Sequence, residues 1–302
     1  MSGFPRVAPI RLILFDAFDT LVTPRSAPHL QYAAVARQYG LDVSNNDVKA
    51  AFKQAFRTTS VEHPNYGLET DIASPDEWWK LVIQRTFSPR LHSGITSEQY
   101  ATAIEPLSQR LVTRFGTSEA YNLFEDVVPT LERLAHIQAG KDRTIRLALA
   151  TNSDSRILSV LKSFDLDRFL ELDVGSESSS HAPGMTASGT MRRSGPTLSY
   201  FEKSAKPDSG FFEAAIRRAS SDNDMIQAAN VLYVGDQLHE DFWGATDAGL
   251  QAAWLQRTTG LESNQPYQQI GKDRSSEQEQ AFVRDRTIPS LSSLIDIVTR
   301  SN

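Results

Sequence analysis

Residues 12–21 read LILFDAFDTL, an apolar run that ends abruptly in two carboxylates and a threonine. Such a run predicts a strand that is buried on both faces of a parallel sheet. In open α/β sheets the ligand crevice lies at the carboxyl ends of the strands, so Asp16 is expected to project into it. There the carboxylate can act as a nucleophile, a metal ligand or both. Taken alone, an Asp after a strand is also a common turn residue.

Three later segments have a similar pattern, with polar residues that follow an apolar strand or lead into a helix. Residues 145–152 read IRLALATN, and residues 206–208 read KPD ahead of a helical pattern. Residues 231–236 read VLYVGD, and Asp241 follows five residues later. Alternating strands and helices predict an α/β fold, a doubly wound parallel sheet with helices on both faces.

An aspartate, then Thr/Ser, then lysine, then an acidic pair, in this order, resembles the haloacid dehalogenase (HAD) superfamily. The resemblance implies a Rossmann-like core in which Asp16 is the nucleophile and forms an aspartyl phosphate. It implies that Lys206 neutralises charge on the nucleophile and on the phosphoryl group. Thr151 and Asn152 are then expected to bind the phosphoryl oxygens through a hydroxyl, an amide and backbone N–H groups.

The same resemblance implies a Mg²⁺ site. Its expected ligands are Asp16, Asp236, Asp241 and the backbone carbonyl of Phe18, because hard cations prefer oxygen ligands. Two structural alternatives remain for the later acids: Asp236 can be a turn residue after Gly235, and Asp241 can be a helix N-cap.

Phe18 departs from the superfamily pattern. HAD phosphatases usually carry a second Asp two residues after the nucleophile, and this Asp serves as general acid and general base. Phenylalanine cannot donate or accept a proton, so it can serve as neither. Losing such a group costs roughly 10²–10⁴-fold in rate. Haloacid dehalogenases have an aromatic residue here, but they do not use a metal site of the kind that Asp236 and Asp241 indicate. Asp19 is an alternative acid, one residue further on. Strand alternation places it on the opposite face from Asp16 unless a turn breaks the alternation, so Asp19 is expected to stabilise the turn.

The parallel-sheet pattern stops after residue 21 and resumes near 127. We expect a core domain over 1–23 and 126–302 and a helical domain over 24–125, which by resemblance is an inserted C1-type cap. Helix N-termini are predicted at Ser44, Ser74 and Thr96. Two further signals are a helix stop at Gly40 and a Pro106 that kinks or ends the third of these helices.

In the later part of the chain, helices are predicted over 129–139 and 290–300. Residues 176–199 are rich in Ser, Gly and Thr and predict a disordered insertion in the core. A tolerated surface loop is favoured for this segment over a site for a protein partner. Residues 261–286 are polar and predict a long surface excursion.

Composition excludes several classes of protein. The chain has 302 residues, 40% hydrophobic and 23% charged, which is ordinary for a globular protein. Its net charge of -6 argues against nucleic-acid and anionic-membrane partners. It has no cysteine, so disulfides and thiolate sites are impossible. No apolar run approaches the roughly 20 residues that span a bilayer. We expect a cytoplasmic or nuclear location, with mitochondrial import left open.

Within the superfamily, HPNYG at 63–67, the tryptophans 78 and 79 and RTF at 85–87 resemble the haloacid dehalogenase-like hydrolase domain-containing 3 type. The expected function is a Mg²⁺-dependent phosphohydrolase of weak or specialised activity on a small phosphorylated substrate. The alternative is a catalytically impaired HAD-fold protein that binds a phosphorylated ligand or a protein partner. A 2-haloacid dehalogenase ranks third and rests on Phe18 alone.

Overall fold

The computed structural model describes residues 8–92, 94–137, 145–173, 195–220, 224–257, 274 and 276–301. They form two compact units. The core unit comprises the described residues of Met1–Thr23, Leu123–Asn152 and Asp165–Asn302, and the helical unit comprises those of Pro24–Asn122 and Ser153–Phe164. Residues 153–164, which the sequence analysis assigned to the core domain, therefore group with the helices.

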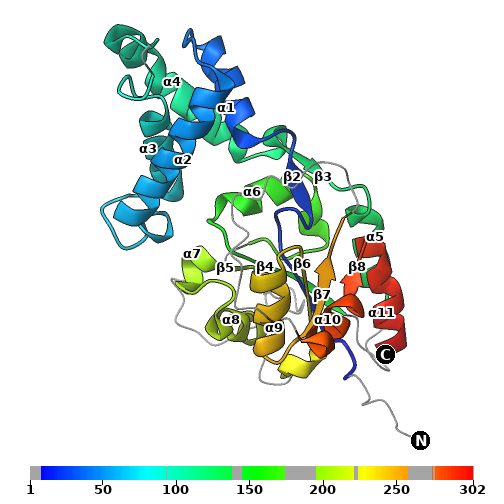
Figure 1. Ribbon diagram of the computed structural model, residues 1–302. Helices are drawn as coiled ribbons and strands as arrows, with labels where there is room; N and C mark the ends of the chain where they lie inside the picture. Colours follow the sequence, from blue (N-terminus) through cyan, green and yellow to red (C-terminus); the bar gives the residue numbers. More distant parts are fainter. Residues whose placement is uncertain are drawn as a thin grey trace, which may run out of the picture. The chain divides into compact units, whose positions relative to one another are not determined.

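A parallel sheet forms the centre of the core unit (Figure 1). Among the described residues its strand order is β5-β4-β1-β6-β7-β8, and each strand pairs in parallel with its neighbours. The strands are β1 Leu12–Phe15, β4 Arg146–Thr151, β5 Thr197–Leu198, β6 Val231–Gly235, β7 Gln251–Leu255 and β8 Thr287–Ile288. A separate two-stranded sheet joins β2 Val22–Pro24 and β3 Tyr121–Leu123.

Helices cover both faces of the sheet, because alternate residues of its buried strands point in opposite directions. On one face Leu14, Tyr233 and Phe212 belong to one apolar cluster, to which α8 and α9 contribute. On the other face α5 packs on β4 and α11 packs on α5. The helices are α5 Val127–Ala135, α7 Ser199–Glu202, α8 Ser209–Ala219, α9 Gly244–Asp247, α10 Glu277–Arg284 and α11 Leu294–Ser301, with a π-helical segment η5 over Leu238–Trp243 and short 3-10 turns η3 Leu166–Arg168, η4 Ala228–Asn230 and η6 Leu291–Ser293.

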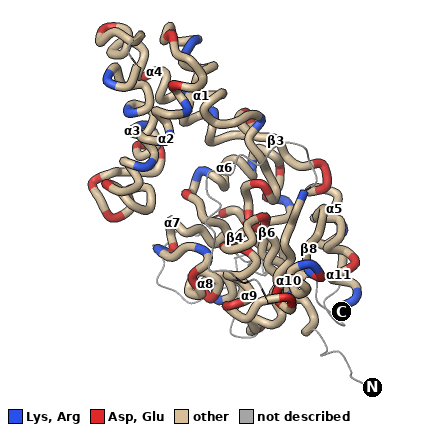
Figure 2. The backbone as a smooth tube through the Cα atoms, in the orientation of Figure 1, with Lys and Arg blue, Asp and Glu red and all other residues tan. Residues whose placement is uncertain are grey.

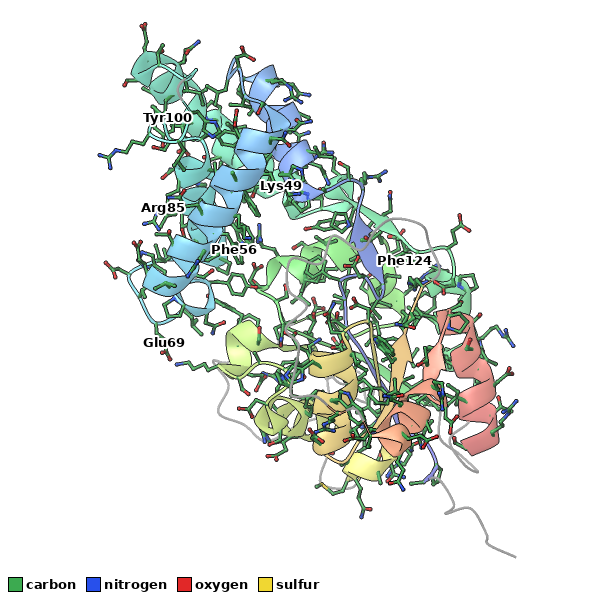
Figure 3. All side chains as sticks on the ribbon, in the orientation of Figure 1. Lys49, Phe56, Glu69, Arg85, Tyr100 and Phe124 are labelled. Carbon is green, nitrogen blue, oxygen red and sulfur yellow. The ribbon has the colours of Figure 1, made fainter. Side chains whose placement is uncertain are left out.

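The helical unit is built on aromatic packing. Phe56 of α2 contacts Trp78 of α3, with the ring centroids 5.6 Å apart and the planes nearly perpendicular (Figure 3). Such edge-to-face pairs add to the stabilisation that apolar burial supplies. Its helices are α1 Pro28–Gln38, α2 Asn45–Glu62, α3 Pro75–Thr86, α4 Ser97–Phe115 and α6 Arg156–Lys162, with 3-10 turns η1 Asn65–Gly67 and η2 Ser118–Ala120.

The predicted helix starts at Ser44, Ser74 and Thr96 and the predicted stop at Gly40 are confirmed. The side chains of Ser44, Ser74 and Thr96 each accept a hydrogen bond from the backbone N–H three residues later, and Thr96 forms a complete capping box. Gly40 follows α1 with φ of +79°, a conformation in which glycine is unstrained. The amphipathic helix expected near the end of the chain is α11.

Several predictions were wrong or need new bounds. Helix α4 continues through Pro106, so the expectation that Pro106 ends this helix is wrong, whereas a kink at Pro106 stays a prediction. Helix α10 lies within 261–286, which the sequence analysis assigned to a surface excursion. The helix predicted over 129–139 begins at Val127 and ends at Ala135. Residues 176–194 lie outside the described residues, whereas Thr197–Leu198 pair with β4 and are part of the sheet.

Charge is distributed over both units. Basic and acidic positions are interspersed along each of them, as Figure 2 shows. No helix of the described residues has the length and apolar character to cross a membrane.

Candidate active site

Asp16 lies directly after β1, in the middle of the sheet. Its backbone N–H donates to the carbonyl of Val234 at 2.9 Å, so the neighbouring strand β6 fixes its position. The residue is only 6% exposed. A buried carboxylate at the carboxyl end of a central parallel strand is where an α/β sheet places ligand chemistry.

Lys206 joins Asp16 to Asp241. Its ammonium donates to Asp16 Oδ1 at 2.8 Å and to Asp241 Oδ1 at 2.6 Å, and its side chain is 2% exposed. Burial alone would lower the pKa of Lys206, but the charges of Asp16 and Asp241 raise it well above its usual value. The lysine therefore carries a fixed positive charge beside the candidate nucleophile.

Asn152 holds the main chain of Lys206. Its side-chain oxygen accepts from the Lys206 N–H at 2.8 Å, and its amide group donates to the Lys206 carbonyl at 3.0 Å. The same amide also donates to Glu240 Oε2 at 3.2 Å. The side chain of Asn152 thus positions the lysine, a role that the sequence analysis did not assign to it.

Two glycines leave room for other parts of the site to approach their backbone closely: Asp241 approaches Gly235, and the loop of Lys206 approaches Gly244. A Cβ on Gly235 would lie 2.2 Å from Asp241 Oδ2, and a Cβ on Gly244 would lie 2.9 Å from the Cα of Pro207. Any larger residue at either position would displace backbone or a site carboxylate. The glycine in the segment VLYVGD is therefore part of the site's construction.

Asp241 is fully buried in η5 and accepts a hydrogen bond at Oδ2 from the Gln237 N–H at 2.8 Å. It is inside the helical segment, so it is not the N-cap residue that the sequence analysis kept as an alternative. Asp236 follows β6 and accepts from Gln237 Nε2 at 2.8 Å.

Three carboxylates converge here. Asp16, Asp236 and Asp241 each offer an oxygen, and these atoms lie within 4.8 Å of one another. Burial, with mutual repulsion among the acids, raises the pKa values of Asp236 and Asp241 above the usual range. A hard divalent cation relieves such repulsion and takes oxygen ligands, so these residues fit Mg²⁺.

Hydrogen bonds hold the turn that follows β1. Asp19 has φ of 53° and accepts from the Thr23 hydroxyl at 2.8 Å, which agrees with the expected turn role. Burial, and to a smaller extent the charge of Asp16, raises the pKa of Asp19 despite that hydrogen bond. Phe18 is half-buried and forms an isolated bridge with Val22.

Thr151 ends β4 and is 1% exposed. A hydroxyl at the end of a central strand can donate to a phosphoryl oxygen.

The core unit thus brings Asp16, Lys206, Asp236 and Asp241 together, with Asn152 bonded to the backbone of the lysine.

The sequence analysis missed two residues that support the site. The Tyr233 ring centroid lies 5.4 Å from the Lys206 ammonium, and its hydroxyl donates to the Ala150 carbonyl at 2.6 Å. Arg257 donates to the Thr20 carbonyl at 2.7 Å and packs 3.8 Å from the Phe124 ring centroid (Figure 3). Neither has a local sequence signal, although Tyr233 lies within the quoted strand.

A second polar group lies within the helical unit. Asp154 is 2% exposed and accepts from Trp79 Nε1 at 2.9 Å and from Arg156 Nε at 3.1 Å. The Arg156 guanidinium in turn lies 4.6 Å from the Trp79 ring centroid. Trp78 is fully buried and donates to the His63 carbonyl, so the two adjacent tryptophans have different partners.

Comparison with known proteins identifies similar sequences and folds. A family model for haloacid dehalogenase-like hydrolase matches residues 10–249. Haloacid dehalogenase-like hydrolase domain-containing protein 3 of Mus musculus is 28% identical over 254 residues, which cover 84% of this chain and 85% of the mouse protein.

Two solved structures are similar in fold. The HAD-hydrolase YfnB from Bacillus subtilis, in a crystal form bound to magnesium, aligns with a TM-score of 0.55 and 18% identity over 96% of this chain and 99% of that one. The 2-haloacid dehalogenase from Pseudomonas syringae pv. Tomato aligns with a TM-score of 0.54 and 20% identity over 97% of this chain and 100% of that one. At such low identity these likenesses bear on the fold alone.

Proposed function

The chain belongs to the haloacid dehalogenase-like hydrolase family, and from that premise we propose that it is a Mg²⁺-dependent phosphohydrolase. The proposed reaction passes through an aspartyl phosphate on Asp16 and acts on a small phosphorylated substrate. The observation that supports it most is the buried cluster in which Lys206 contacts Asp16 and Asp241 while Asp236 lies beside them.

Each residue has a proposed role. One oxygen of Asp16 is held by Lys206, which leaves the second oxygen to attack phosphorus. Lys206 also screens the negative charge of the approaching phosphoryl group, and the Thr151 hydroxyl and the backbone of Asn152 bind its oxygens. Mg²⁺, when held by Asp16, Asp236, Asp241 and the backbone carbonyl of Phe18, supplies positive charge that keeps the carboxylates ionised.

The helical unit is proposed to act as a cap that determines specificity, since lids in many enzymes complete the site and exclude water. Of residues 176–199, which the sequence analysis considered as a site for a protein partner, residues 176–194 lie outside the described residues.

Phe18 supports a second candidate, a relative that binds a phosphorylated ligand and does not turn it over. A side chain without a titratable proton cannot act as acid or base. The retained nucleophile, lysine and acidic cluster count against this candidate. A metal-independent 2-haloacid dehalogenase is disfavoured further, because such an enzyme has no use for three converging carboxylates.

The proposal is tested by hydrolysis of an aryl phosphate with and without Mg²⁺, beside Asp16→Asn. The proposal expects turnover that needs Mg²⁺ and disappears in the variant. Turnover that is the same in Asp16→Asn would exclude Asp16 as the nucleophile. Saturable binding of Mg²⁺ and a phosphate analogue without any turnover would favour the binding protein.

A further inference from the structure

Among the described residues of the core unit, Asp16 is accompanied by the positive charge of Lys206, and a phenylalanine stands two positions after it. We propose that the physiological substrate is a phosphoric anhydride, namely an acyl phosphate or a diphosphate, and not an alkyl phosphate ester. This inference rests on the proposed function, because it names the substrate class of that same site.

Phe18 is the first observation behind the proposal. Phe18 lies two residues after Asp16, and Asp19, which follows it, turns the chain with a φ of 53°. A group that protonates a leaving oxygen must lie within about 2.6–3.2 Å of that oxygen. The residue two positions after Asp16 is a half-buried phenylalanine, whose ring has no proton to give.

The neighbouring polar groups of the core unit are held in other contacts. The Lys206 ammonium donates to two carboxylates. Asp19 accepts from Thr23 inside a tight turn, and Glu240 accepts from Asn152. In the described part of the core unit, each of these polar groups is therefore already engaged by a neighbouring residue of the site.

The chemistry then selects the leaving group. Asp16 attacks phosphorus, its Oδ–P bond forms, and the P–O bond to the leaving group breaks with its electron pair going to the leaving oxygen. An unprotonated alkoxide is a strong base, comparable to hydroxide, and is therefore a poor leaving group. A carboxylate leaves with a conjugate-acid pKa of about 4. A phosphate leaving group has a second pKa of about 6.

The second step is consistent with this argument. Water attacks the phosphorus of the aspartyl phosphate, the P–O bond to Asp16 breaks, and the electron pair returns to the Asp16 carboxylate. Both protons of the water end on the released dihydrogen phosphate. The group expelled here is itself a carboxylate, so this cleavage also needs no acid. Without a base to accept a proton from water, however, this step is slow.

The test compares leaving groups on the full chain with Mg²⁺. The substrates are acetyl phosphate, 4-nitrophenyl phosphate, phenyl phosphate and ethyl phosphate, and the readout is kcat/KM against the pKa of the leaving group. We expect a steep fall from acetyl to ethyl phosphate. Phe18→Asp is expected to raise ethyl phosphate cleavage by about 10²–10⁴-fold and to flatten the plot. Phe18→Asn, which has the same size as that Asp and no acidic proton, is expected to bring no such gain.

A natural protein that cleaves ethyl phosphate as efficiently as acetyl phosphate would overturn the inference and leave the proposed function standing. Selective loss of ethyl phosphate cleavage in Asp19→Asn would overturn it too, because that result would identify Asp19 as an acid. Absence of any turnover that depends on Asp16, acetyl phosphate included, would instead remove the proposed function and this inference with it.

Discussion

The side chain of Asn152 contacts the backbone of Lys206 on both sides, accepting from its N–H at 2.8 Å and donating to its carbonyl at 3.0 Å. These residues are 54 positions apart in the sequence. The loop that carries the lysine is therefore fixed by the end of β4, where Thr151 and Asn152 lie. Placement of the ammonium against Asp16 depends on this pair of hydrogen bonds.

Asn152→Ala removes both hydrogen bonds and loosens the backbone of Lys206. Because misplacing a catalytic group by about 1 Å can cost roughly 10²-fold in rate, we expect kcat for an aryl phosphate to fall by about 10–100-fold. The matched control is Asn230→Ala, which removes an exposed hydrogen bond to the Pro9 carbonyl. Equal kcat in the two variants would show that Asn152 does not position the lysine.

Asp236 should make stability depend on pH. Its pKa is raised in the folded protein by burial and by Asp241, so the folded chain binds a proton that the unfolded chain has already lost. Stability from this group is present below the unfolded pKa of about 4 and is lost as pH rises towards the folded pKa. Without Mg²⁺, the free energy of unfolding should therefore fall with pH relative to Asp236→Asn, by at most about 1.4 kcal/mol per pH unit.

Mg²⁺ should reverse that trend, because it binds the ionised carboxylate. In the natural protein, the rise in Tm that Mg²⁺ causes is expected to be larger at pH 8 than at pH 5, because binding of Mg²⁺ releases about one proton. In Asp236→Asn the rise in Tm is expected to be much smaller. Thermal melts at several pH values measure both quantities. A Mg²⁺ effect of equal size in the two proteins would argue against Asp236 as a ligand.

Gly235→Ala should damage the acidic cluster. The added methyl carbon would meet the Asp241 carboxylate at 2.2 Å, so the carboxylate or the strand must move. We expect a loss of about 1–3 kcal/mol in the free energy of unfolding and a weaker stabilisation by Mg²⁺. Gly40→Ala is the control, since it has a φ of +79° and open space around the new atom. It should cost about 1 kcal/mol from backbone strain and leave the Mg²⁺ effect intact.

In the helical unit, Asp154→Ala should leave the positive charge of Arg156 without its partner carboxylate. Burial would lower the pKa of Arg156, but the Asp154 carboxylate raises it, and the indole N–H of Trp79 loses its acceptor as well. Removing one partner of such a pair costs about 3 kcal/mol. The double variant Asp154→Ala/Arg156→Met should be more stable than the single variant in denaturant titrations. Additive losses would mean that the ion pair contributes nothing.

The sequence indicated the core well because its signals are local. An apolar run followed by Asp16 or Asp236 reports a buried parallel strand and its carboxyl end without any knowledge of distant contacts. The helix starts at Ser44, Ser74 and Thr96 are equally local, since each cap bonds a backbone N–H three residues away.

Long-range effects explain the failures. Pro106 costs about 3 kcal/mol inside a helix, yet Leu107 and Leu111 bury the face of α4 and the helix continues. Helix α10 follows a capping box from Ser276 to Glu279, a signal that was available in the sequence but was obscured by its polar surroundings. The roles of Asn152 and Tyr233 depend on partners far along the chain, which no local pattern specifies.

The central claim is that Asp16 becomes phosphorylated, and a pre-steady-state experiment tests it most directly. The natural protein and Asp16→Asn are mixed with 4-nitrophenyl phosphate and Mg²⁺, and nitrophenol release is followed from the first milliseconds. We predict a burst in the natural protein that approaches one nitrophenol per chain and is followed by a slow phase, with no burst in Asp16→Asn. Equal behaviour of the two proteins, or a Mg²⁺-loaded natural protein that releases no nitrophenol, would contradict the account.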